Sequence, residues 1–150
     1  MNGNYLPDVA NQLAGQEIKS ALVAAITAGT DPGEQTLGVV GPCAAGIAIS
    51  GARLSLQVPS GSVTANDTNY TTLTVNKRTA GGAAVPIAAG SFKTTGGGGI
   101  GNLAANSSVV LPGVAGATVA PGDLITLTVT HGGGGVAVPA SIVELFGSLN

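Results

Sequence analysis

The sequence has very few charged residues. They make up 8% of its 150 residues, with five Lys or Arg and seven Asp or Glu, whereas an average soluble domain carries about 25%. The formal net charge of −2 provides no basic field for phosphate groups, so we expect no nucleic acid partner. Because surface charge ordinarily keeps monomers apart, this composition favours a chain that associates with other subunits.

Long apolar runs and cysteines are also scarce. No run approaches the roughly 20 apolar residues of a membrane-spanning helix, and the best candidate, residues 20–30, is too short. Residues 1–5 lack the basic region and apolar run of a signal peptide. Cys43 is the single cysteine, which excludes an internal disulfide. These features predict no membrane partner and synthesis in a reducing cytoplasm.

Groups suited to catalysis or metal binding are few. His131 is the only histidine, the acids are scattered, and no G-x-S-x-G nucleophile motif occurs. Gly96, Gly98 and Gly101 satisfy a GxGxxG pattern, but the residues that follow resemble a turn and not the helix that a dinucleotide site requires. We therefore predict that the protein is not an enzyme and uses no cofactor or metal.

The first 45 residues differ in pattern from the rest. Pro7 and Asp8 form a plausible helix start, and apolar residues then recur at steps of three and four from Ala10 to Ile26. This spacing predicts one apolar stripe on a helix. An extended arm that reaches a neighbouring molecule is the alternative. We assign residues 1–45 to an amino-terminal arm or helical segment on this basis.

Short runs of alternating apolar and polar residues dominate residues 46–150. The clearest are residues 52–58, 71–77 and 124–130, and weaker runs lie at 46–49, 85–88, 91–94 and 107–111. Gly, Pro and Asn separate the runs, which is typical of an antiparallel β-sandwich with one buried face on each sheet. The sequence thus predicts an all-β fold, with a jelly-roll or an immunoglobulin-like topology as the alternatives.

Threonine occupies the outward positions of two predicted strands. In residues 71–77, Leu73 and Val75 should face inward, with Thr72, Thr74 and Asn76 outward; residues 124–130 repeat this with three threonines. Threonine favours β geometry, and its hydroxyl stays hydrated without titrating. Such a surface suits a protein that must remain soluble over wide ranges of salt and pH.

Three short motifs resemble those of a known class of proteins. They are Thr64-Ala65-x-x-Thr68-Asn69-Tyr70, Pro121-Gly122-Asp123 and Val138-Pro139-Ala140. Over residues 46–147 the chain resembles the small β-sandwich structural proteins of tailed bacteriophages, which serve as head decoration (cement) proteins or head fibres. The resemblance implies a non-enzymatic virion protein on the capsid exterior. Its partners would be the major capsid protein and further copies of itself, as a dimer or trimer.

Two sets of residues are candidates for contacts between subunits or with the capsid. The apolar candidates for anchoring are Tyr5, Leu6, Val9, Leu13, Ile18 and Leu22. The cationic candidates for contacts with an acidic partner are Arg53, Lys77, Arg78 and Lys93. The alternative for these cations is a role as solvated charges that discourage pairing at strand edges.

A competing interpretation is a head- or tail-fibre module that binds carbohydrate on the host surface. Sugar rings generally stack on exposed aromatic side chains, and the aromatic residues available are Tyr5, Tyr70, Phe92 and Phe146.

Overall fold

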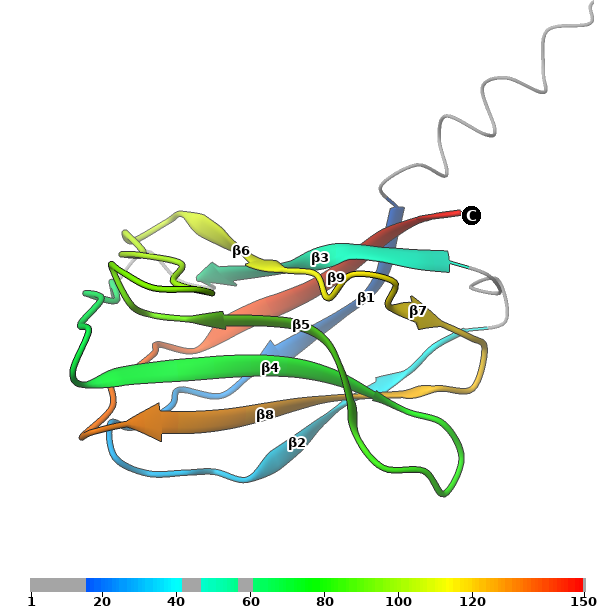
Figure 1. The fold of residues 1–150 in the computed structure, drawn as a ribbon, viewed down its shortest axis with the longest axis horizontal. Coiled ribbons are helices and arrows are strands. Elements are labelled where there is room, and N and C mark those ends of the chain that lie inside the picture. Colours follow the sequence, from blue (N-terminus) through cyan, green and yellow to red (C-terminus); the bar gives the residue numbers. More distant parts are fainter. Residues whose placement is uncertain (1–15, 42–46, 57–60, 150) are drawn as a thin grey trace, which may run out of the picture.

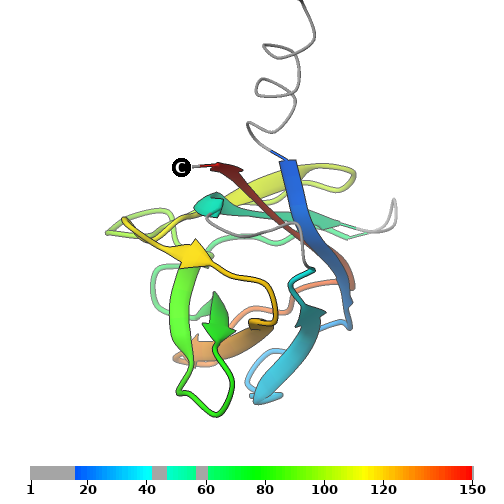
Figure 2. The ribbon, with the colours of Figure 1, turned by 90° about the vertical axis from the view of Figure 1, so that its right-hand side faces the viewer.

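The structure, a computed structural model, describes residues 16–41, 47–56 and 61–149, and their regular secondary structure is entirely β-strand. The strands form two antiparallel sheets that lie face to face (Figure 1). Figure 2 shows the same sandwich from one end, with the sheets as two layers around a common interior. The predicted all-β antiparallel sandwich is therefore confirmed.

The larger sheet has five strands, in the order β1-β9-β3-β6 with β7 also beside β3. Its members are β1 (Gln16–Val23), β3 (Ile47–Leu56), β6 (Ser108–Pro112), β7 (Thr118–Val119) and β9 (Ser141–Leu149). The smaller sheet has four strands, in the order β2-β8-β4-β5. Its members are β2 (Glu34–Val39), β4 (Tyr70–Arg78), β5 (Val85–Ser91) and β8 (Leu124–Gly132).

The interior is built from the inward positions of the central strands. Ile125, Leu127 and Val129 of β8 are all fully buried, as the alternation in residues 124–130 predicted. Leu73 and Val75 of β4 face the same interior. Apolar side chains from both sheets and from the loops complete the core, among them Phe92, Leu103, Leu111, Val143 and Leu145. Burial of these side chains is the main force holding the two sheets together.

The helix predicted from Ala10 to Ile26 is wrong over its described part. Residues 16–23 form β1, which pairs with β9 along its length, and Ile26 makes an isolated bridge to Val138. Val23 at the end of β1 and Ile26 at the bridge are buried, while Leu22 stays exposed. A spacing of three and four can arise by chance in alanine-rich sequence, and tertiary pairing overrides such a weak local preference.

Two strands lie within the residues that we assigned to an arm. β1 pairs with β9, and β2 pairs with β8, so both are integral parts of the sandwich. The expected boundary near residue 45 therefore does not separate them from the β domain. The part of the expected arm before Gln16 lies outside the described residues.

The stacking of the two sheets creates two lateral edges. β1 and β2 are the terminal strands on one side, and β6 and β5 are the terminal strands on the other. β1 packs against β2, and β5 packs against β6. On the second side the sheets are also joined directly, because the Val114 amide donates to the Ile87 carbonyl at 2.8 Å. These two edges carry the surface features described next.

Candidate interaction surfaces

Large apolar side chains are exposed along both lateral edges. On the edge formed by β1 and β2, Leu22 is 64% exposed and Val39 is 57% exposed. On the opposite edge, Val85 of β5, Val110 of β6 and Val114, just after β6, are between 42% and 49% exposed. A terminal strand has a neighbour on one side only, so apolar residues there stay accessible unless another molecule covers them. The edges are thus the candidate association surfaces.

The edge strands carry features that discourage uncontrolled strand pairing. Pro86 in β5 has no amide hydrogen to donate. The pairing register shifts between Glu17 and Lys19 in β1 and between Thr36 and Gly38 in β2, and such irregularities disrupt a ladder locally. The Lys19 side chain lies over Gly38, where a Cβ would be 2.4 Å from Cε. Contacts at the edges are therefore better made by side chains than by strand addition.

An apolar groove opens on the edge formed by β5 and β6. It has a volume of about 200 Å³ and lies between the start of β5 and the segment 114–118. Val85 and Val114, both exposed, lie in its walls together with Pro86 and Ile87. The segment 114–118 turns back tightly, with Gly116 at a φ of 73° and the Ala117 amide donating to the Val114 carbonyl. We call this feature the β5 groove.

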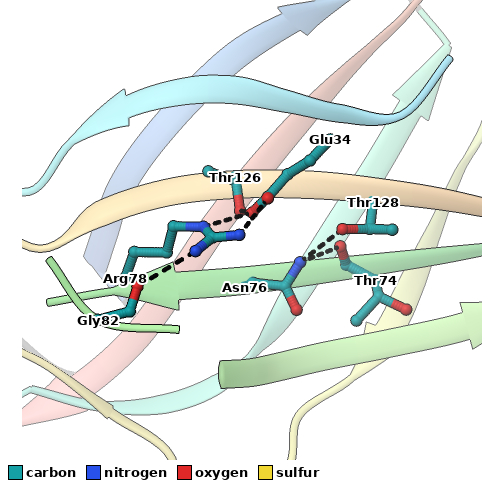
Figure 3. A network of polar contacts seen from close by, with 7 residues as sticks. All are labelled: Glu34, Thr74, Asn76, Arg78, Gly82, Thr126 and Thr128. Atoms are coloured by element: carbon teal, nitrogen blue, oxygen red, sulfur yellow. Dashed lines mark hydrogen bonds and ion pairs between the residues drawn. The ribbon is translucent and has the colours of Figure 1, made fainter. Parts of the chain in front are cut away.

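The outer face of the smaller sheet is coated with hydroxyl and amide groups. The pairing of β4 with β8 sets Thr72 opposite Thr130 and Thr74 opposite Thr128. Asn76 donates from its amide nitrogen to the Thr128 hydroxyl at 3.0 Å (Figure 3). These groups bond to one another across the strands, so the face is polar without carrying much charge.

One ion pair closes this face at its end. Arg78 donates to both carboxylate oxygens of Glu34, at 2.9 and 2.5 Å, and a third donation from Arg78 goes to the Gly82 carbonyl (Figure 3). Thr126 donates its hydroxyl to the same carboxylate. The bond from Arg78 and then that from Thr126 lower the pKa of Glu34 to about 2. The pair ties β2 to β4 across β8, which is a structural role.

A histidine-centred hydrogen-bond network lies at the end of the sandwich where β8 leaves the sheet. His131 contacts the Thr71 hydroxyl at 2.8 Å through Nδ1 and the Thr30 carbonyl at 2.9 Å through Nε2. The Thr71 hydroxyl also donates to the Val136 carbonyl and accepts from the Val136 amide. The network therefore joins the loop after β1 and the loop after β8 to the buried side of β4.

Asp67 organises the neighbouring loop at the same end. It accepts hydrogen bonds from the Thr94 and Thr95 amides and from the Thr94 hydroxyl. These bonds, the one from the Thr94 hydroxyl foremost, lower the pKa of Asp67 to about 2. Nearby, Lys93 places its Nζ 4.2 Å from the centre of the Tyr70 ring, a favourable cation–π geometry. Both contacts hold the loop after β5 against the start of β4.

The cationic candidates from the sequence lie apart and most of their charges are already engaged. Arg78 is paired with Glu34, Lys77 donates to the Thr118 carbonyl at 2.5 Å, and Lys93 lies over Tyr70 at the other end of β4. Arg53 lies in β3, where its backbone pairs with Val110 and Glu144. The fold therefore does not gather the four residues into a basic patch.

The apolar candidates are only partly within the described chain. Tyr5, Leu6, Val9 and Leu13 lie outside it. Ile18 is in β1 beside the register shift, and Leu22 is the most exposed of the large apolar side chains that the structure describes. The exposed edge valines were not identified from the sequence, although pairs of adjacent valines indicate them. Neighbouring residues in a strand face opposite ways, so one of Val109 and Val110 must point outward.

Two of the candidate aromatic residues, Tyr70 and Phe92, offer little for stacking a sugar, and Tyr5 lies outside the described residues. Phe92 is completely buried, and the Tyr70 ring is covered by Lys93. Among residues 16–41, 47–56 and 61–149, no three His, Cys, Asp or Glu side chains lie close enough together to hold a metal ion. The segment after Gly101 forms an isolated bridge between Leu103 and Val63 instead of the helix that a dinucleotide motif needs.

In the same described part of the chain, no helix has the length and apolar character to cross a membrane. Comparison with known proteins finds no matching family model, no similar curated protein and no similar solved structure.

Proposed function

We propose that this protein is a structural component of a virus particle, a decoration (cement) protein that binds the outside of a capsid lattice and bridges major capsid protein subunits. It is made in the cytoplasm of a bacterial host and performs no reaction. The observation that carries the proposal is the exposure of apolar side chains along both lateral edges of a sandwich with very few charges.

The magnitude of this exposure favours binding to a lattice over strong pairing in solution. Among the side chains whose exposure the structure describes, the exposed fractions of the large apolar residues on each edge sum to little more than one fully exposed side chain. Burial of that surface is worth about 2–4 kcal/mol. Association of two molecules costs an estimated 4–15 kcal/mol in lost freedom. Contacts on one edge alone are therefore too weak to hold two molecules together in solution. In a lattice a molecule can make contacts on both edges at once, and the second contact then forms without the full loss of freedom that the first one costs.

Binding of this kind stabilises a shell by mass action. A protein that binds assembled coat subunits and not free ones shifts the equilibrium toward the intact shell. The outer face of the smaller sheet then meets solvent through Thr72, Thr74, Thr128 and Thr130, while Asn76 and Thr126 on the same face are buried. The exposed hydroxyls keep their state as pH changes. Homo-oligomerisation as a dimer or trimer on the lattice belongs to the same proposal.

The test compares particles that carry this chain with particles from a host in which its gene is deleted. Complete particles should contain it in many copies and should withstand heating and low salt better than deleted ones. Complementation with the wild-type chain should restore the resistance, while complementation with a Leu22→Asp, Val110→Asp double variant should not. Equal resistance of complete and deleted particles would refute the cement role.

Carbohydrate binding by a fibre module is the competing proposal, and the engaged Tyr70 ring and the buried Phe92 count against it. A glycan array probed with the purified protein separates the two, because a decoration protein should give no specific signal.

A further inference from the structure

We infer that the β5 groove is the docking site for the amino-terminal segment Tyr5–Val9 of this same protein, and that this contact is available in the free chain without any capsid. The inference goes beyond the virion role, since it assigns an occupant to a surface on the sandwich itself. The size of the groove, its charge and its distance from the start of β1 support this assignment.

The groove has the size and lining for large apolar side chains. Its volume of about 200 Å³ exceeds that of an engineered apolar cavity of about 150 Å³ that accepts benzene. Val85 and Val114 leave nearly half of their surface uncovered in its walls. The segment Tyr5–Val9 supplies an aromatic ring, a leucine and a valine within five residues, so it can fill this volume with apolar groups.

The groove also carries a charge that complements the segment. Lys77 lies in its lining and uses one donor on the Thr118 carbonyl, which leaves two of the three ammonium donors for another acceptor. Asp8 lies within the segment, between the apolar residues. A docked segment can therefore pair Asp8 with Lys77 while its apolar side chains cover Val85 and Val114.

The start of β1 is on the same end of the sandwich as the groove. Gln16 pairs with Gly147, Gly147 pairs with Ile49, and Ile47 pairs with Val119, next to Thr118 in the lining. Figure 1 shows the start of β1 and β7 at this common end. Three strand spacings amount to about 14 Å, and the two-residue step along β3 from Ile49 to Ile47 adds about 7 Å at a right angle, which gives a direct distance of about 16 Å. Residues 10–15 can span about 20 Å when extended. The segment therefore reaches its own groove, and equally that of an adjoining copy.

Cysteine cross-linking tests the contact directly. In a Cys43→Ser background, the pair Leu6→Cys and Val114→Cys should form a disulfide at least tenfold faster under mild oxidation than the pair Leu6→Cys and Val110→Cys. Val110 is a matched control because it is 48% exposed on the same edge but does not line the groove. A fast-migrating monomer on a non-reducing gel identifies docking within one chain, and a dimer identifies docking between copies; either result supports the inference.

A second measurement covers the case in which the two sulfurs cannot meet in bonding geometry. Val114→Cys alone, again with Cys43→Ser, should react with a maleimide at least tenfold faster once residues 2–9 are deleted, while Val110→Cys should react at the same rate in both forms. Equal cross-linking of both pairs together with an unchanged maleimide rate at position 114 would overturn the inference. That outcome would leave the virion proposal intact, because the particle assay does not depend on the groove.

Discussion

Replacement of Thr71 with valine tests the hydrogen-bond network that joins the loops at one end of the sandwich. The two side chains have nearly the same shape, and Thr71 is completely buried, so the packing should be preserved. The substitution removes the hydroxyl that accepts from the Val136 amide at 3.0 Å and donates to the Val136 carbonyl at 2.6 Å. It also removes the 2.8 Å contact to His131 Nδ1.

The expected loss follows from the groups that are left without a partner. A buried polar group that loses its hydrogen bond costs about 1–3 kcal/mol. Water can partly reach the half-buried Val136, which reduces the cost of leaving its backbone groups unpaired. Burial of the valine methyl group that replaces the hydroxyl stabilises the variant by about 0.8 kcal/mol. We expect a net loss of about 2 kcal/mol in the free energy of unfolding and a Tm lower by about 4–8 °C.

Urea denaturation followed by circular dichroism, together with calorimetric Tm values, measures the effect. Thr130→Val is the matched control, because the same substitution is made at an exposed position of the adjacent strand β8. Its stability should stay within about 0.5 kcal/mol of the wild type. If Thr71→Val proves as stable as Thr130→Val, the network does not hold these loops and the reasoning fails.

Two further predictions concern pH and packing. The pKa of Asp67, about 2 in the folded chain against an ordinary value of 3.8, is lowered by folding, so its contribution to stability is present above about pH 4 and is lost as the pH falls toward 2. The Tm difference between wild type and Asp67→Asn should therefore shrink from pH 5 to pH 2 in calorimetric scans, and a constant difference would contradict this. Gly90→Ala should lose about 1–3 kcal/mol in urea denaturation, because its Cβ would lie 2.7 Å from Ile100 Cγ2 and 2.9 Å from Leu111 Cδ2. Gly97→Ala, with no atom within 4 Å, should be neutral, and equal effects at the two glycines would be evidence against the packing around β5.

The central strands were predictable from the sequence because their constraint is local. In residues 124–130 the side-chain period of two dictates which residues share a face, and the apolar set Ile125, Leu127 and Val129 can only be the buried one. The weaker runs near 85–88 and 107–111 likewise became β5 and β6. The strands β2 and β7 were missed. β7 has only two residues, and β2, with the sequence EQTLGV, lacks a regular alternation of apolar and polar residues.

The candidate surfaces were much less predictable. The sequence indicated that Lys77, Arg78 and Lys93 are present, but not that each already has a partner within the molecule. Arg78 meets Glu34 across 44 residues of sequence, and no local pattern encodes a contact at that separation. The β5 groove arises in the same way, from two segments that meet only when the sheets stack.

By itself the sequence determined the class of fold and the character of the surface. The alternation of apolar and polar residues dictates the strands, and Gly, Pro and Asn separate them. Few charged residues and many threonines make the exterior polar but nearly neutral. Tertiary structure alone decided that residues 16–23 form a strand, that Thr71 is buried, and that exposed valines lie along the edges. The physical reason is that periodicity acts between neighbours in the chain, whereas strand order and sheet stacking depend on the burial that all segments achieve together.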